Sequence, residues 1–593
     1  MGKNELRSTQ VITTFGPGAM VDFPDVSVLV GGLDRWRYDK SKLPIIQEPR
    51  LTTKLRALTG IPDLILRQPP PERDEDYGPK SEIVVWRFPE WFIVQRTQIT
   101  KQKFRRRRLV HLDHLDKGKF RDADNKRYSV VPVRFVRACT RGHVGDIDWI
   151  AYVHGLGNSC HRDLWMEERG TSGDLDEVFV VCECGAEQPM SRAARRKLHA
   201  MGPCDGSRPW LGPRTREACD KDNRLLIRSA SNAYFPQLMS VISIPDTRGP
   251  LDDVVRSLWD DFLIDVESFT DLQRVRKKPT VAAKLQGISD EEVYAAIERT
   301  RNGDESATRG IKEVEFEALS EAKEELGADV PEGNFFARAL PRSKWRAPWM
   351  ESVSRVVLVH RLREVVAQVG FTRFESAGPD IEGELDINVE RAKLGLDISW
   401  LPAVENRGEG IFIMFDPQHI QTWREKTAVA QRARVLQGGF NSWKADHARD
   451  DYRFPGPSYY LLHSISHLLL TVISLECGYP AASLRERVYA SQDRYGILLY
   501  TGSADAEGTL GGLVGAGRDI RRYVQLALEH GRLCSNDPIC AYHSPTQEDH
   551  QNLLGSACHG CLLIAETSCE QHNAFLDRSL VVQTVESIGA EFF

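Results

Sequence analysis

Cysteines that could bind a metal gather near the C-terminus of the chain. Cys558 and Cys561 form a C-x-x-C pair, Cys569 follows them, and Cys534 and Cys540 precede them. These five candidates compete for the four places of a tetrahedral zinc shell. Thiolates alone can close such a shell, and no general base stands at a catalytic spacing beside them, so the expected site is structural. Its metal would clamp the chain end onto the preceding domain.

A second cysteine group lies between residues 136 and 225. Its candidate ligands are Cys139, His143, Cys160, His161, Cys182, Cys184 and Cys204. The sequence CECG resembles a zinc knuckle, a tight turn in which a glycine follows the second thiolate. One closed site with spare thiols and two sites sharing the set both remain possible. Together, the two groups predict at least two zinc ions per chain.

Other candidates for chemistry are weaker. His463 and His467 stand at i, i+4 on an expected helix, but HSISH lacks the glutamate of a zincin, so a buried core pair is favoured. The glycine-rich stretch 505–517 lacks the Gly-Lys-Ser/Thr ending of a phosphate-binding loop, and no G-x-S-x-G elbow is present. The sequence therefore predicts an accessory subunit without an ATPase, hydrolase or nuclease centre.

The sequence also predicts the cellular compartment and the redox state of these cysteines. The N-terminus MGKNELRSTQ is polar and lacks the apolar core of a secretory signal, which predicts a cytoplasmic protein. Twelve cysteines in such a chain are expected to be thiols or metal ligands rather than disulfides, and a redox pair would need a thioredoxin-like βαβ setting. The most apolar stretch, 459–478, contains histidines and hydroxyls and predicts a buried helix, with no membrane span.

The net charge of -6 does not indicate a nucleic-acid binder, so any basic surface must be local. The clearest candidate is the run Arg105, Arg106, Arg107 and Arg108. A solvated loop or hairpin edge is the favoured interpretation of such a run. Contact with nucleic acid is the alternative.

The chain divides into four expected parts of an α+β, multidomain protein. They are a β-rich N-terminal domain (1–135), a zinc-stabilised module (136–225), a linker and helical domain (226–345) and a C-terminal α/β domain with the second cysteine cluster (346–593). A length of 593 residues suits three or four domains. In the module, fading periodicity suggests that metal replaces a large hydrophobic core.

Several elements are predicted within these parts. Strands are expected within 81–88 and 90–96, and an exposed proline-rich loop at 66–81. Ser289 and Glu292 have the spacing of a capping box that begins a charged surface helix, which ends at Gly303. A second charged surface helix is expected from 311, ending at Gly327. In the C-terminal domain, helices are expected at 354–370 and 457–476, and strands at 409–416 and 495–502.

Longer stretches resemble a known family. RSTQVITTFGPGAMVDFPDVSVLVGGLDRW, CTRGHVGDIDW, CDGSRPWLG, SASNAYFPQLMSVISIP, WLPAVENRGEGIFIMFD and LRERVYA are similar to the DrmB family of the bacterial DISARM anti-phage defence system. The resemblance implies an obligate partner of a separate superfamily-two helicase, DrmA, which would supply ATP hydrolysis. The complex would engage phage DNA, and methyltransferases would mark self.

The end of the chain is also similar to the metal-binding cysteine domain of MrfA-type repair helicases. Cys558, Cys561 and Cys569 match its cysteines, and Asn573 and Leu576-Asp577-Arg578 match its Asn and its Leu-Asp-Lys/Arg motif. The match leaves the fourth ligand open between Cys540 and Cys534. It implies that a domain fused to the motor in those helicases is here a separate subunit.

Two other functions compete with this one. A metal-dependent nuclease could use scattered carboxylates to hold Mg²⁺. An independent, sequence-specific DNA-binding protein is the other alternative.

Overall fold

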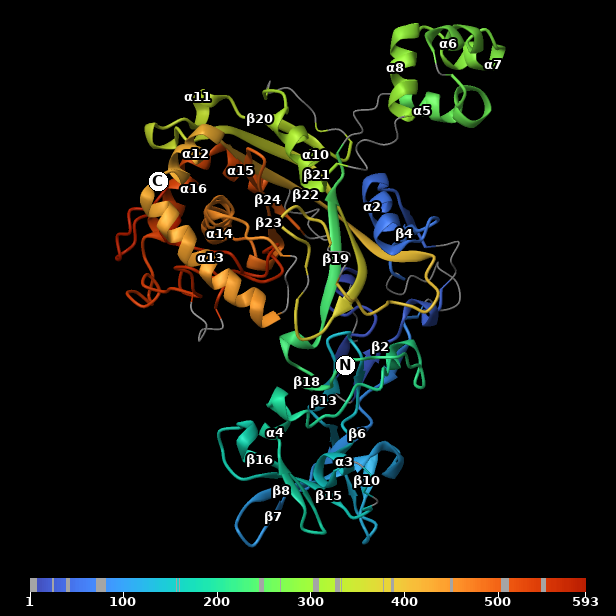
Figure 1. The fold of residues 1–593 in the computed structure, drawn as a ribbon, viewed down its shortest axis with the longest axis vertical. Coiled ribbons are helices and arrows are strands. Elements are labelled where there is room, and N and C mark those ends of the chain that lie inside the picture. Colours follow the sequence, from blue (N-terminus) through green and yellow to red (C-terminus); the bar gives the residue numbers. More distant parts are fainter. Residues whose placement is uncertain are drawn as a thin grey trace.

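The structure is a computed structural model of mixed helix and sheet, which confirms the α+β class (Figure 1). It describes residues 8–593 apart from 24–25, 39–42, 71–81, 156, 159, 245–249, 267, 302–308, 326–330, 332, 377, 386–388, 448–451, 503–510 and 546–550. Most of the proline-rich loop and the expected helix stops Gly303 and Gly327 lie outside the described residues.

An eight-stranded sheet forms the centre of the molecule. Its main path runs through β19 (Phe235–Ile242), β21 (Val353–Thr372), β22 (Trp400–Phe415), β24 (Arg494–Thr501) and β23 (Leu484–Ser491), all antiparallel. β20 (Phe336–Ala339) pairs with β21. β4 (Ile65–Arg67) pairs in parallel with β22 and carries β3 (Ile45–Ile46). The strands expected at 409–416 and 495–502 are thereby confirmed.

The helix predicted at 354–370 is wrong, because these residues form most of β21. Its alternate side chains enter different hydrophobic clusters: Val356 and Leu358 lie in one, Val357 and Val359 in another. A strand buried on both faces reads as a continuous apolar run, which periodicity alone does not separate from a buried helix. The β-branched valines favour the strand.

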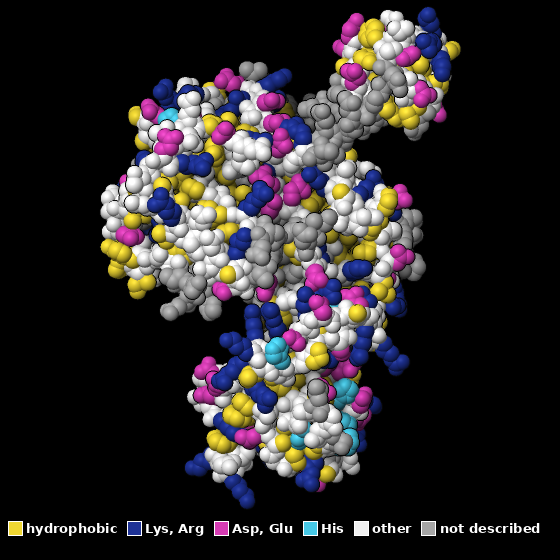
Figure 2. Space-filling view, in the orientation of Figure 1, with side chains coloured by type: hydrophobic (Ala, Val, Ile, Leu, Met, Phe, Trp, Pro, Cys, Tyr) yellow, Lys and Arg dark blue, Asp and Glu magenta, His cyan; other side chains and the backbone are white. Residues whose placement is uncertain are grey.

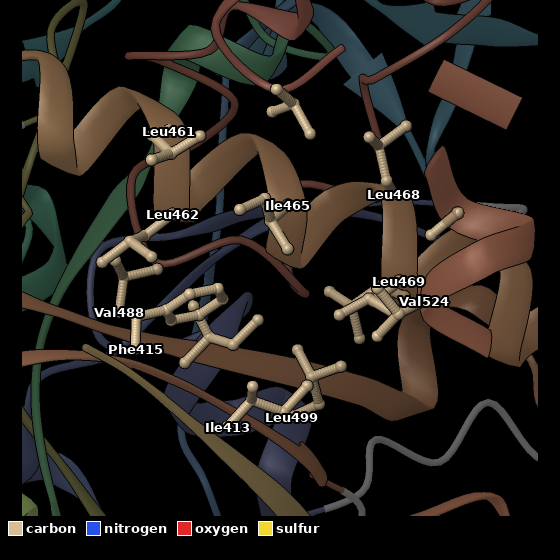
Figure 3. Close-up of a cluster of buried hydrophobic side chains, with 14 of the residues drawn as sticks. Ile413, Phe415, Leu461, Leu462, Ile465, Leu468, Leu469, Val488, Leu499 and Val524 are labelled. Atoms are coloured by element: carbon tan, nitrogen blue, oxygen red, sulfur yellow. The ribbon is translucent and has the colours of Figure 1, made fainter. Parts of the chain in front are cut away.

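The largest hydrophobic core lies between this sheet and a layer of helices. The helices are α12 (Pro417–Arg424), α13 (Thr427–His447), α14 (Pro457–Cys477), α15 (Gly512–Arg518) and α16 (Ile520–Gly531). Figure 3 shows α14 at the centre, where Leu462, Ile465 and Leu469 face side chains of the sheet and of α16. The predicted helix at 457–476 is confirmed. α14 is apolar and long enough to cross a membrane, but 72% of its most apolar window is buried inside the protein.

A seven-stranded sheet organises the N-terminal region. Its path is β12 (Val130–Pro132), β6 (Trp91–Val94), β8 (Arg105–His111), β15 (Leu164–Glu168), β16 (Val178–Cys182) and β17 (Glu187–Pro189), and β7 (Gln98–Ile99) pairs with β8. Strands from 1–135 and 136–225 therefore share one sheet. The four-part division of the chain stays a prediction. Beneath the sheet, Trp149, Phe135 and Met190 belong to a hydrophobic core, so 136–225 does not depend on metal alone.

Smaller elements complete this region. Three-stranded sheets contain β1 (Met20–Asp22), β2 (Ser27–Val30) and β5 (Val85–Arg87); β9 (Leu115–Asp116), β10 (Lys119–Arg121) and β11 (Arg127–Tyr128); and β14 (Val144–Gly145), β13 (Phe135–Ala138) and β18 (Arg224–Ile227). Helices are α1 (Ser8–Thr13), α2 (Pro49–Thr59), α3 (Trp149–His154) and α4 (Ser191–Ala194). The strands expected within 81–88 and 90–96 are confirmed by β5 and β6.

The helical segment is partly as expected. α5 (Pro250–Ser257), α6 (Phe269–Val275), α7 (Pro279–Lys284) and α8 (Asp290–Arg301) share their own small core and project from the main body in Figure 1. The capping box before α8 is confirmed, because the Glu292 amide donates to Ser289 Oγ and the Ser289 amide to the Glu292 carboxylate.

The rest of this segment differs from the prediction. α10 (Ile311–Ser320) ends seven residues before Gly327, and it is not a surface helix, because it packs into the main body and buries Glu315 completely. β20 and α11 (Arg342–Trp345) follow it.

Arg373, just after β21, connects distant parts of the chain. Its guanidinium is fully buried and donates to the carbonyls of Gly142 (2.9 Å), Gly18 (2.7 Å) and Ala233. Burial lowers the pKa of Arg373 to about 10, so it stays charged at neutral pH. The central sheet is thereby tied to the N-terminal segment and to the loop that carries Cys139 and His143.

Candidate metal centres

The structure brings Cys139, His143, Cys204 and Cys219 together as a first centre, with ligand atoms within 4.8 Å of one another. His143 Nδ1 lies 3.3 Å from Cys139 Sγ and 3.4 Å from Cys204 Sγ. Gly142, at φ 86°, closes the turn that points Cys139 and His143 at the same place. Three thiols and one imidazole are a donor set that structural zinc prefers.

Outer contacts orient the ligands of the first centre. His143 Nε2 lies 2.8 Å from Glu217 Oε1, so Glu217 fixes the ring and leaves Nδ1 facing the thiols. The Gly206 amide donates to Cys204 Sγ at 3.3 Å. The contact with Cys204 lowers the pKa of Cys139, which favours the thiolate that a metal needs.

A second centre consists of His154, Cys160, Cys182 and Cys184. Cys182 ends β16 and Cys184 lies in the following turn, where Gly185 has a φ of 98° as the knuckle predicts. Cys160 Sγ is 3.7 Å from Cys182 Sγ, and His154 Nε2 is 3.9 Å from Cys184 Sγ. The backbone contact of Cys184 with Ala186 lowers the pKa of this thiol.

The third centre contains four cysteines, Cys534, Cys540, Cys558 and Cys561. Their Sγ–Sγ separations include 3.4 Å (Cys534–Cys558), 3.7 Å (Cys540–Cys561) and 3.8 Å (Cys558–Cys561). A tetrahedral zinc with Zn–S distances of about 2.3 Å sets its sulfurs about 3.8 Å apart, so the spacing fits.

Electrostatics favour thiolate at one position of the third centre. Burial opposes ionisation of Cys558, but hydrogen bonds from the Asn536 side chain and the Gly560 amide outweigh it and lower its pKa to about 7.

The predicted ligands are thus sorted into separate sets. Of the two alternatives for 136–225, the groups fit two sites, and Cys219 and His154, which local spacing does not indicate, fill the fourth places. His161 is exposed and stands outside both groups, although its neighbour Cys160 belongs to the second.

Cys569 was expected in the C-terminal cysteine centre, and the structure places it elsewhere. Its Sγ lies 3.2 Å from His463 Nε2, in a buried group with His467 and Glu486. Cys540 and Cys534, between which the sequence left the fourth ligand open, both join the third centre instead.

The arginine run lies on β8, an inner strand of the seven-stranded sheet, so the expectation of a loop or hairpin edge is wrong. Arg107 pairs with Glu168 at 2.7 Å, Arg108 pairs with Asp163, and Arg106 stacks over Trp165 at 4.4 Å. Arg105 is exposed. Contact of these residues with nucleic acid stays a prediction.

Comparisons with known proteins support zinc binding at the third centre. The MrfA Zn-binding domain family matches residues 465–562, which include the whole third centre. A domain of unknown function, DUF8724, matches residues 7–235, which include the first two centres. The chain is 32% identical over 528 residues to the DISARM protein DrmB of Bacillus paralicheniformis, covering 85% of this chain and 90% of that protein. The chain therefore belongs to the DrmB family of DISARM proteins.

Proposed function

We propose that the chain is a non-catalytic subunit that binds and stabilises a DrmA-like superfamily-two helicase and helps it engage phage DNA. Membership of the DrmB family supports a role in DISARM anti-phage defence. The observation that carries the proposal is the match of 465–562 to the MrfA Zn-binding domain in a sequence that lacks a Walker loop. A zinc-binding domain of this type would dock beside a motor that another chain provides.

Exposed apolar side chains beside the third centre support this docking. Leu533, Ile539 and Tyr542 are 73%, 82% and 60% exposed, although they flank or separate the ligands Cys534 and Cys540. Large apolar side chains held out on a metal-stiffened loop are typical of protein contacts. We propose that this loop, 533–542, contacts the helicase.

A basic hollow supports contact of the complex with DNA. It has a volume of about 530 Å³ and is lined by Arg195, Arg196, Lys221 and Arg224, by Asp222 and by uncharged residues. Lys221 and Arg224 also pair with Glu390 and Glu375. Figure 2 shows dark blue side chains gathered over this part of the molecule, around α4 and β18. Clustered cations release counterions from phosphates, so they favour nucleic acid irrespective of its sequence. Arg105 to Arg108 are the second proposed DNA contact.

Co-expression with a DrmA-like helicase tests the proposal. We expect the two chains to co-purify and the helicase to show higher DNA-stimulated ATPase activity in the complex than alone. Leu533→Asp with Ile539→Asp should abolish co-purification. Ile99→Asp, which alters a similarly exposed side chain (70%) on β7, is the matched control and should leave it intact. A helicase that purifies and functions equally well without this chain would refute the accessory role.

The same preparation separates the competing functions. Incubation of the chain alone with Mg²⁺ and single- or double-stranded DNA should give no cleavage, whereas cleavage abolished by EDTA would favour a nuclease. Competition between unrelated DNA sequences should show no preference if the complex reads phosphates. We also propose a cytoplasmic location, which cell fractionation tests.

A further inference from the structure

Four chemically reactive side chains meet in the hydrophobic core below the central sheet. His463 and His467 come from α14, Glu486 from β23 and Cys569 from the C-terminal segment. Glu486 Oε1 lies 2.8 Å from His463 Nε2 and 3.2 Å from His467 Nε2. The side chains of both histidines and of Glu486 have no solvent exposure.

Backbone contacts fix which nitrogens face the centre of this group. His463 Nδ1 lies 3.3 Å from the Phe575 carbonyl, and His467 Nδ1 lies 2.8 Å from the Leu562 carbonyl. A carbonyl only accepts hydrogen bonds, so each Nδ1 carries a proton. In each neutral ring, Nε2 then carries a lone pair that points at the carboxylate and the thiol.

The two other members are held as acceptors. The amides of Asn573 (3.1 Å) and Gln571 (3.4 Å) donate to Cys569 Sγ, so the sulfur already acts as an acceptor, while burial and the Glu486 carboxylate raise the pKa of the thiol. Ser466 Oγ donates to the second oxygen of Glu486. Two imidazole lone pairs, one carboxylate oxygen and one sulfur therefore converge, all within 4.8 Å of one another.

A positive charge at the centre would satisfy all four of these acceptor atoms at once. Two imidazolium ions could supply it, but each buried ion then loses its hydration, which is unfavourable by several kcal/mol per ion. A divalent metal uses all four atoms as ligands at once. Imidazoles that donate Nδ1–H to backbone carbonyls are the usual outer shell of metal-binding histidines.

We propose that His463, His467, Glu486 and Cys569 bind a fourth ion, a zinc-class divalent metal separate from the three cysteine-rich centres. Two nitrogens, one oxygen and one sulfur are all zinc donors, and four protein ligands close the shell, so the centre is structural. His463 and His467 are buried, as expected of a core pair. Glu486 of β23 and Cys569 of the C-terminal segment supply the other two ligands of the proposed site. The ion would join α14, β23 and the chain end.

Metal content of the full-length chain tests this centre. Elemental analysis should find one equivalent less in His467→Gln than in wild type, and likewise in Cys569→Ser. Tyr459→Phe, which alters a buried neighbour whose ring lies 5.4 Å from that of His463, is the matched control and should keep the full content. Cys561→Ser reports on the third centre alone, so failure of the zinc clamp and failure of this proposal are distinguishable.

A second measurement does not depend on the folding of variants. Anomalous diffraction at the zinc edge from wild-type crystals should show a peak between His463 Nε2, His467 Nε2, Glu486 Oε1 and Cys569 Sγ. Absence of that peak, or unchanged metal content in His467→Gln, would overturn the proposal in favour of a buried ion-pair network.

Discussion

Asp577 belongs to the Leu-Asp-Arg segment that follows the last cysteine, and we predict that Asp577→Asn loosens the end of the chain. The Asp577 side chain is completely buried, and Arg432 of α13, 8% exposed, donates from Nε to Asp577 Oδ2 at 2.6 Å. The Ser556 and Ser579 amides donate to its other oxygen. The substitution would leave a buried guanidinium without its counter-charge.

The structure sets the magnitude. Removal of one partner from a buried ion pair typically destabilises by about 3–5 kcal/mol. Arg432 keeps its contacts to the His543 carbonyl (3.3 Å) and Ser556 Oγ (3.2 Å), and an asparagine oxygen can still accept from the two amides. We therefore expect the lower limit, about 3 kcal/mol, which corresponds to roughly hundredfold faster local opening.

Hydrogen–deuterium exchange of residues 551–593 measures this opening directly. Asp116→Asn is the control, because Asp116 also pairs with two arginines but on the surface, so exchange of 551–593 should not change. An Asp577→Asn chain that exchanges at the wild-type rate would refute the reasoning.

The Asp577–Arg432 pair also predicts how the stability of the chain end depends on pH in acid. Burial opposes ionisation of Asp577, but Arg432 and the donated hydrogen bonds lower its pKa below the ordinary value. A depressed carboxyl pKa contributes stability that is present above the unfolded pKa, about 4, and is lost as pH falls through the folded pKa. Wild type should therefore approach the exchange rate of Asp577→Asn only in strong acid.

Three further predictions concern the metals and the basic residues. Cys561→Ser should lose one zinc equivalent and become protease-sensitive between 534 and 563, while the buried Leu576, Leu580 and Val581 keep the end of the chain packed. Cys477→Ala, at an exposed thiol, is the control, and retention of zinc by Cys561→Ser would contradict the third centre. In elemental analysis, Cys219→Ser and His154→Gln should each remove one zinc equivalent, and the double variant should remove two. If the double variant lost one equivalent alone, the first and second centres would be a single site. Replacing Arg105 to Arg108 with Ala should flatten the salt dependence of DNA binding by the complex. It should also lower the stability of the chain modestly, by about 1 kcal/mol or less for each half-exposed ion pair lost. A salt titration with an unchanged slope would show that these residues do not contact DNA.

The candidate centres show what the sequence could and could not reveal. Short spacing identified Cys558 with Cys561 and Cys182 with Cys184, because a C-x-x-C or C-x-C turn places two thiols side by side. Long-range ligands carry no such signal: Cys219 lies 80 residues from Cys139, and their sulfurs are 3.9 Å apart. Short spacing also gave one wrong grouping. It placed Cys569 with Cys561, but Cys561 lies in the third centre and Cys569 lies with His463, His467 and Glu486.

Secondary structure was predictable where the hydrophobic period was clear. The prediction was wrong where burial on both faces of a strand hid that period. α14 and the capping box of α8 are evident from apolar runs and end signals. In β21, Arg363 and Glu364 interrupt the valines and imitate a polar helix face. Both are buried in the sheet, where Arg363 contacts Glu48 (3.2 Å) and Glu364 accepts from Arg485 (2.9 Å). Partners that far away in sequence cannot be read from a local pattern.

The buried Arg373 has a consequence for synthesis on the ribosome. Its hydrogen bond to Gly18 joins residues 355 positions apart. At a translation rate of about 5–20 residues per second, the N-terminal segment must wait roughly 20–70 s for this partner to emerge. During that interval its share of the core, including Leu29 and Val136, remains open to solvent. Nascent chains of this protein should therefore bind holding chaperones until β21 and Arg373 have left the exit tunnel.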